Sequence, residues 1–168
     1  RSSTHNRLAP HRDARERLLN SAEQLFAERG YAAVSTRKIA ELAGLGRLWE
    51  RGDPERAAVC YREALDAGLS GLAAHAARLR LARWEKRRAR WEAACALWEA
   101  ASRAEIFDPR PWEELAKFHE HRSRDMALAR SIVSTALDLA HAASASARTL
   151  ETFTHRLGRL NRRLALPR

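Results

Sequence analysis

Three stretches of the chain repeat one spacing of apolar residues: an Ala, a large apolar residue four positions on, and a second Ala three positions later. Steps of three and four fall on one face of an α-helix. A repeat period in the mid-thirties is typical of stacked pairs of helices, none of which can bury its apolar face alone. The pattern therefore predicts an all-α fold of helical hairpins. The three stretches are Ala57, Tyr61 and Ala64, then Ala94, Trp98 and Ala101, then Ala129, Val133 and Ala136.

Further residues of similar type lie upstream of each stretch. They are Leu45, Gly46 and Trp49 in the first unit, Leu81, Ala82 and Trp91 in the second, and Trp112, Leu115 and Ala116 in the third. Together with the Ala pattern they resemble the tetratricopeptide repeat (TPR) family over Leu45 to Leu137. The resemblance implies a short TPR-like α-solenoid of about three helical hairpins over residues 45–140. It also implies a non-catalytic scaffold whose partner is a protein or peptide.

The TPR resemblance assigns a packing role to one set of residues. They are Trp49, Ala57, Tyr61, Ala64, Leu81, Ala94, Trp98, Ala101, Trp112, Leu115, Ala129, Val133 and Ala136. In the first unit, we expect Leu48 and Trp49 to face the second helix near Tyr61. The second unit carries Ala89 where the family has a glycine between its helices.

Further helices are predicted on both sides of the repeats. Residues 1–11 show no pattern and are expected to be a disordered lead-in. Apolar spacing predicts a helix from Arg12 that Gly30 closes, and then a second helix over Thr36–Ala43 that Ser35 caps and Gly44 ends. Helix breaks are expected at residues 52–54, 67–71 and 107–111, where Gly, Asp and Pro gather.

The last predicted helix, residues 146–166, has an apolar stripe and a basic face. A polar outer face is what a solenoid needs at its end, so this helix is expected to cap the repeats. The stripe is Leu150, Phe153, Leu157, Leu160 and Leu164. The basic residues are Arg148, Arg156, Arg159, Arg162 and Arg163.

The segment before the repeats, residues 12–44, carries a second set of motifs. Leu25-Phe26 leads to Gly30-Tyr31, and Ile39-Ala40 leads to Ala43-Gly44. These motifs resemble the start of the TetR-type regulator DNA-binding domain, in which a further helix enters the major groove. The resemblance implies an alternative function as a DNA-binding transcriptional regulator, which would normally be a dimer.

The TetR resemblance gives roles to four residues. Thr36, Arg37 and Lys38 at a helix start would contact phosphates, and Arg47 would contact a base edge or a phosphate. Two interpretations of the junction remain open, a shortened recognition helix or a motif cut where the first repeat begins; we favour the repeat. In a purely structural interpretation, these helices cap the repeats and their charges are solvated.

A third resemblance covers the chain from Leu45 on, and especially residues 107–122, which is similar to the C-terminal repeat region of bacterial ribonuclease-H-like exonucleases. The catalytic part of those enzymes lies upstream and carries acidic metal ligands, and nothing before Leu45 resembles it. The resemblance implies a non-catalytic accessory module. Because the chain starts at Arg1 rather than Met, we expect a fragment or a processed product.

Charge adds nucleic acid as a candidate partner. The net charge is +10, and only three of the 31 basic residues are lysine. An Arg-rich surface favours non-specific nucleic-acid binding, although abundant Arg and Ala also arise from a GC-rich genome. The five tryptophans suggest either base stacking or, as we prefer, repeat packing.

Several kinds of chemistry are not expected. His119 and His121 lie two apart and would point to different helix faces, so neither a metal nor a cofactor is predicted. Acidic residues are expected on helix surfaces, and no phosphate loop or nucleophile motif occurs, so the chain is predicted not to be an enzyme. Cys60 and Cys95 are expected to be small buried thiols in a reducing cytoplasm. No apolar run is long enough for a membrane span, and the oligomeric state stays open.

Overall fold

The computed structural model describes the backbone of residues 36–165 and the side chains of residues 41–165. The predicted lead-in, the predicted helix from Arg12 to Gly30 and its connector through Ser35 lie outside the described residues. The positions discussed below are therefore those of the junction, the repeats and the final helix.

The described residues form seven helices and no strand, which confirms the all-α prediction. Their contacts divide between Leu69 and Ser70 into unit 1, with two helices, and unit 2, with five. Unit 1 comprises α2 (Thr36–Trp49) and α3 (Pro54–Asp66). Unit 2 comprises α4 (Gly71–Arg87), α5 (Trp91–Ser102), α6 (Pro109–His121), α7 (Met126–Ala142) and α8 (Ala147–Ala165).

The helix breaks follow local capping chemistry. Asp53 precedes Pro54 and accepts a hydrogen bond from the amide of Arg56, and Asp108 precedes Pro109 and accepts one from the amide of Arg110. The side chain of an N-cap Asp accepts a hydrogen bond from an amide in the first turn that has no partner inside the helix. A Pro at the first helical position has no N–H group of its own that would need such a partner. Each of the three predicted breaks overlaps a gap between helices and includes the first residue of the next helix, Pro54, Gly71 or Pro109.

Helix α2 runs through Gly44, which was expected to end it. It continues from Thr36 to Trp49, so the prediction that Gly44 closes a helix at Ala43 is wrong. A glycine inside a helix costs only about 1 kcal/mol relative to Ala, which packing can offset. Here Gly46 is buried against α3, and the close packing of the two helices offsets the low propensity of this segment.

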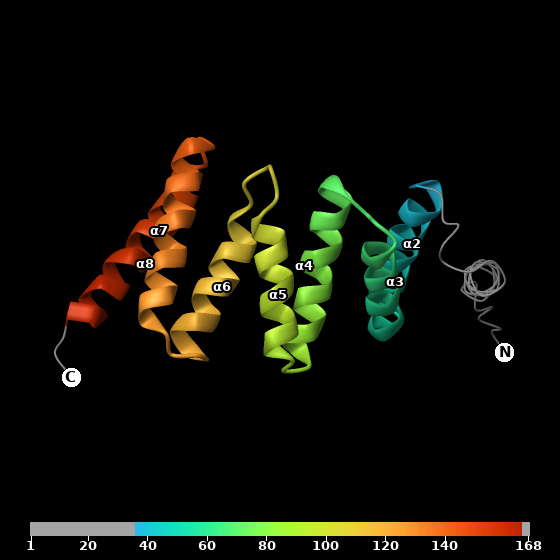
Figure 1. The fold of residues 1–168 in the computed structure, drawn as a ribbon, viewed down its shortest axis with the longest axis horizontal. Coiled ribbons are helices and arrows are strands. Elements are labelled where there is room, and N and C mark those ends of the chain that lie inside the picture. The colour runs from blue at the N-terminus through green and yellow to red at the C-terminus, as the bar shows by residue number, and fades with distance from the viewer. Residues whose placement is uncertain (1–35, 166–168) are drawn as a thin grey trace, which may run out of the picture. The chain divides into compact units, whose positions relative to one another are not determined.

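In unit 2, each helix packs against the next one in the chain. The contacting pairs are α4 with α5, α5 with α6, α6 with α7 and α7 with α8. Figure 1 shows the five helices following one another in chain order. This arrangement leaves each helix a neighbour on both sides, except at the two ends of the unit.

Two clusters form the core of unit 2, and each joins a helical pair to the next helix. The first contains Ala82, Ala94, Cys95, Trp98 and Leu115, from α4, α5 and α6. The second contains Ala116, Ala129, Val133, Ala136, Phe153 and Leu160, from α6, α7 and α8. Small residues at the centre allow the helix backbones to approach closely, so the core is built largely of Ala.

Candidate functional site

The four predicted DNA-contacting residues all lie on α2. Thr36, Arg37 and Lys38 form its first turn, where backbone amides lack partners inside the helix. Arg47 is exposed near the last turn. Eleven positions separate Thr36 from Arg47, or about 16 Å along the helix. The residues therefore share one helix but do not meet at a single point.

Close packing at the C-terminal half of α2 joins the junction to α3. A Cβ atom added to Gly46 would lie 2.6 Å from a ring carbon of Tyr61. The Tyr61 hydroxyl donates a hydrogen bond to Glu50, and the guanidinium of Arg56 lies 4.8 Å from the ring centre of Trp49. Residues 45–49 thus form the C-terminal end of α2, and this end packs against α3.

Leu48 departs from its predicted place. Its side chain is 54% exposed, so the expectation that it faces α3 is wrong. Trp49 is partly buried. Because α2 continues without a break, Leu48 falls on the outer face of the helix beside Arg47, and the contact with α3 is made by Gly46 instead.

The residues assigned to repeat packing are mostly buried. Trp49 and Trp112 are partly buried, and the others are at most 3% exposed. The fully or nearly fully buried ones are Ala57, Tyr61, Ala64, Leu81, Ala94, Trp98, Ala101, Leu115, Ala129, Val133 and Ala136.

The chain's own cations cover the faces of four of the five tryptophans. Arg56 lies over Trp49, Arg88 and Arg90 over Trp84, Arg122 over Trp91, and Lys86 over Trp98, all within 5.9 Å of a ring centre. Cation–π contacts of this kind compete with stacking by a ligand. The rings are therefore poorly placed for base stacking.

Ion pairs join alternate helices of unit 2. His75 of α4 lies 2.6 Å from a carboxylate oxygen of Asp108, next to α6. Lys86 of α4 donates to Glu114 of α6. Burial alone would raise the pKa of Asp108, but hydrogen bonds from Arg110 and His75 outweigh it and lower the pKa to about 2. These contacts keep Asp108 ionised at neutral pH and fix the start of α6.

Glu120 is a buried carboxylate at the centre of a cluster of arginines. It is 2% exposed, and its oxygens accept hydrogen bonds from Arg156, Arg159 and Arg163 of α8 at 2.7–3.1 Å. Burial alone would raise its pKa, but the hydrogen bond from Arg159 and the neighbouring cations lower it. Three arginines of the predicted basic outer face are therefore bound to a buried acid.

Sequence reasoning missed both Glu120 and Glu85. Glu85 is 5% exposed and accepts a hydrogen bond from Arg90. Both residues were expected on helix surfaces. Nothing in the local pattern marks Glu120, because its partners lie at least 36 positions away. The run of arginines on one face of α8 was the available signal, since such a run needs a counter-charge if it is to be buried.

The remaining candidates offer little chemistry. No group of three or more His, Cys, Asp or Glu residues in the described part of the chain could hold a metal ion. Cys60 and Cys95 are free thiols, and Cys60 is only partly buried. Burial and the neighbouring Glu99 raise the pKa of Cys95 to about 11, so this thiol stays protonated. No helix among the described residues is long and apolar enough to cross a membrane.

Comparison with known proteins gives a match near the N-terminal end. Residues 18–47 match the family model for bacterial regulatory proteins of the tetR family. No curated protein and no solved structure matches the chain. The match spans less than a fifth of the 168 residues and ends within α2. Over this segment the chain is similar to the start of bacterial tetR-family regulatory proteins.

Proposed function

We propose that the chain binds duplex DNA through the segment 18–47, and that its function is binding rather than catalysis. The observation that carries the proposal is the match of this segment to bacterial regulatory proteins of the tetR family. The matched segment contains all four residues expected to contact DNA, namely Thr36, Arg37, Lys38 and Arg47.

The geometry favours contacts with phosphates over contacts with bases. The first amides of an α-helix lack partners within it and attract anions, and Arg37 and Lys38 add charge at the start of α2. Arg47 is the exposed basic side chain of α2 near its other end. A single bidentate Arg supplies about 1–3 kcal/mol of discrimination between bases. Because α2 and the expected recognition segment form one helix, we expect strong salt dependence and weak sequence preference.

The test is a salt titration of the full chain with duplex DNA of random sequence. Each phosphate contact adds about 0.9 to the slope of log affinity against log salt concentration. The double variant Arg37→Ala/Lys38→Ala should lower the slope by about two. The matched control Arg130→Ala/Arg148→Ala removes the same charge from exposed positions of unit 2 and should lower the salt slope less. Equal losses in both variants would contradict binding through this segment.

A second function, partner binding by unit 2, rests on a different observation. The residues of the repeated Ala pattern are buried, and each core cluster joins a helical pair to the following helix. Such an arrangement, read as a short TPR-like solenoid, exposes an extended surface that suits a protein or peptide. Selection of a random peptide library on the immobilised chain tests it, because enrichment of a shared motif supports partner binding and its absence contradicts it.

A further inference from the structure

One cavity of unit 2 is lined both by exposed aliphatic side chains and by arginines. Its volume is about 720 Å³, and it lies between the start of α4, the end of α5 and the loop that leads into α6. Its lining includes Leu72, Arg78, Arg103, Ile106 and Asp108. A volume of this order accommodates several side chains of a ligand.

The apolar part of the lining is unusually exposed. Leu72 is 69% exposed and Ile106 is 64% exposed, the two highest values among the large apolar side chains of the described residues. Both border the same cavity, although they come from different elements, α4 and the loop before α6. Exposed aliphatic groups brought together in a hollow indicate a place where another apolar group binds.

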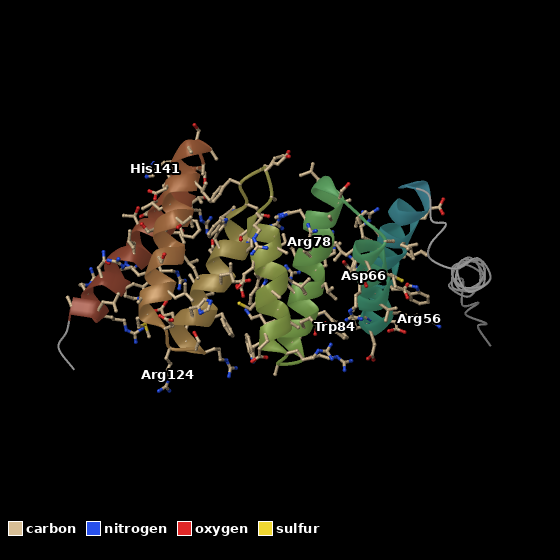
Figure 2. All side chains as sticks on the ribbon, viewed as in Figure 1. Arg56, Asp66, Arg78, Trp84, Arg124 and His141 are labelled. Atoms are coloured by element: carbon tan, nitrogen blue, oxygen red, sulfur yellow. The ribbon has the colours of Figure 1, made fainter. Side chains whose placement is uncertain are left out.

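The charged part of the lining indicates the sign of the ligand. Asp108 is already engaged by His75 and Arg110. The guanidinium groups of Arg78 and Arg103 contact no carboxylate in the described part of the chain. Figure 2 shows Arg78 on α4. Two such arginines against one further acid, Glu105, leave an excess of positive charge in the cavity.

We propose that this cavity binds a peptide segment of a partner protein in which acidic and aliphatic residues alternate. The inference rests on the second function above, partner binding by unit 2. The carboxylates of the peptide pair with Arg78 and Arg103, and its aliphatic side chains contact Leu72 and Ile106. Charge-assisted hydrogen bonds give the preference for an acidic residue, and aliphatic contact excludes water from them. The carboxylates of the lining, Glu105 and Asp108, disfavour a continuous polyanion such as nucleic acid.

The experiment uses the full chain and fluorescein-labelled peptides, with binding followed by fluorescence anisotropy. The first peptide alternates Glu and Leu, the second replaces Glu with Lys, and the third replaces Leu with Ser. We expect the first peptide to bind at least tenfold more tightly than either of the others. Equal binding of the first and third peptides would overturn the proposal, because it would reduce the interaction to attraction by net charge.

Variants of the chain locate the binding. Arg78→Ala and Arg103→Ala should each weaken the first peptide about tenfold, the usual effect of losing one charge-assisted hydrogen bond. Arg130→Ala, which removes an exposed arginine outside this cavity, should leave the affinity unchanged. Equal weakening by all three variants, or no binding by the first peptide at about 1 mM, would overturn the proposal.

The selection from the random peptide library distinguishes failure of the cavity proposal from failure of partner binding by unit 2. If the selected motif is basic or purely apolar, the cavity proposal fails while partner binding stands. If no motif is selected and the first peptide does not bind, both fail. An enriched motif that combines Asp or Glu with Leu, Ile or Val supports both.

Discussion

The close packing of α2 on α3 requires a residue without a side chain at position 46. Gly46 is buried, and a side chain there would meet the ring of Tyr61 at less than van der Waals distance. Gly44, two positions earlier, has open space, with its nearest neighbour at 3.9 Å. The two glycines look alike in the sequence, but the structure gives them opposite roles, because only Gly46 lies on the packed face of the helix.

Replacement of Gly46 by Ala should destabilise unit 1. The added methyl group forces the Tyr61 ring out of its place, and overpacking of this kind costs about 1–3 kcal/mol. Urea unfolding, with hydrogen exchange of the amides of α2 and α3, measures the effect. Gly44→Ala is the matched control and should be neutral or stabilising by up to about 1 kcal/mol, because Ala favours a helix. Equal effects of the two changes would contradict the described packing.

Ala89 occupies a backbone conformation that favours glycine. Its φ angle is 57°, in the left-handed region, at the turn between α4 and α5. The TPR pattern has a glycine at this position, and the φ angle of Ala89 shows why a glycine suits it. A side chain in the left-handed region costs about 1–2 kcal/mol.

Ala89→Gly should therefore stabilise unit 2 by about 0.5–1 kcal/mol, since relief of strain exceeds the entropy that glycine gains on unfolding. Ala96→Gly serves as control, because Ala96 is exposed inside α5 and its replacement should cost about 1 kcal/mol. Urea denaturation of both variants checks the opposite signs. Destabilisation by Ala89→Gly would show that the turn does not strain this residue.

Asp108 makes stability depend on pH in the acidic range. Its pKa of about 2 in the fold lies below the ordinary value of 3.8, so folding favours the ionised form. The stabilisation is therefore complete above about pH 4–5 and is lost as the pH falls towards 2. Asp108→Asn keeps a good N-cap and removes the charge.

The wild-type chain should exceed Asp108→Asn in free energy of unfolding by about 2 kcal/mol at neutral pH. The difference should shrink below about pH 4 and disappear near pH 2. Urea unfolding at a series of pH values measures it. A difference that stays constant across this range would show that the charge of Asp108 makes no contribution.

Among the elements, α8 depends on polar contacts as well as its apolar stripe. Phe153 and Leu160 of the predicted stripe are fully buried in the second core cluster. On another face, three arginines bind Glu120 of α6. The helix thus packs by its apolar stripe in the second core cluster, and its arginines bind the counter-charge that α6 supplies.

Glu120→Gln should destabilise the docking of α8. A neutral amide leaves three neighbouring guanidinium groups without a balancing charge, at a cost of about 2–4 kcal/mol. This cost is near the low end of the range for breaking a buried ion pair, because the side chains of Arg159 and Arg163 are partly exposed. Hydrogen exchange of the α8 amides should rise. Glu113→Gln, which breaks a surface contact with Lys117, should cost less than about 0.5 kcal/mol. If both variants behave alike, Glu120 does not hold α8.

The helices could be predicted from the sequence better than their ends and their polar contacts. Asp-Pro at 53–54 and 108–109 sets two helix starts locally, so both were predicted. The continuation of α2 through Gly44 could not be read locally, because packing of Gly46 on Tyr61 decides it. Likewise, the arginines that bind Glu120 come from α8, far away in the sequence. No local pattern therefore identifies Glu120 as a buried acid.

At the scale of the whole molecule, the two units suggest two binding activities. Unit 1 contains the end of the segment that matches the bacterial regulatory family, and unit 2 contains two of the three Ala-pattern stretches and the exposed cavity. The net charge of +10 promotes association with any polyanion. Charge alone therefore cannot distinguish DNA binding by the matched segment from attraction by the arginines of unit 2, and the location of the contact must be measured.

Cross-linking of the full chain to duplex DNA that carries photoreactive bases measures that location directly. Mass spectrometry of the products identifies the cross-linked peptides. If the matched segment binds DNA, cross-links concentrate within residues 18–47 and decline in the Arg37→Ala/Lys38→Ala variant. Cross-links confined to residues 70–165, with the variant behaving as the wild type does, would contradict the account.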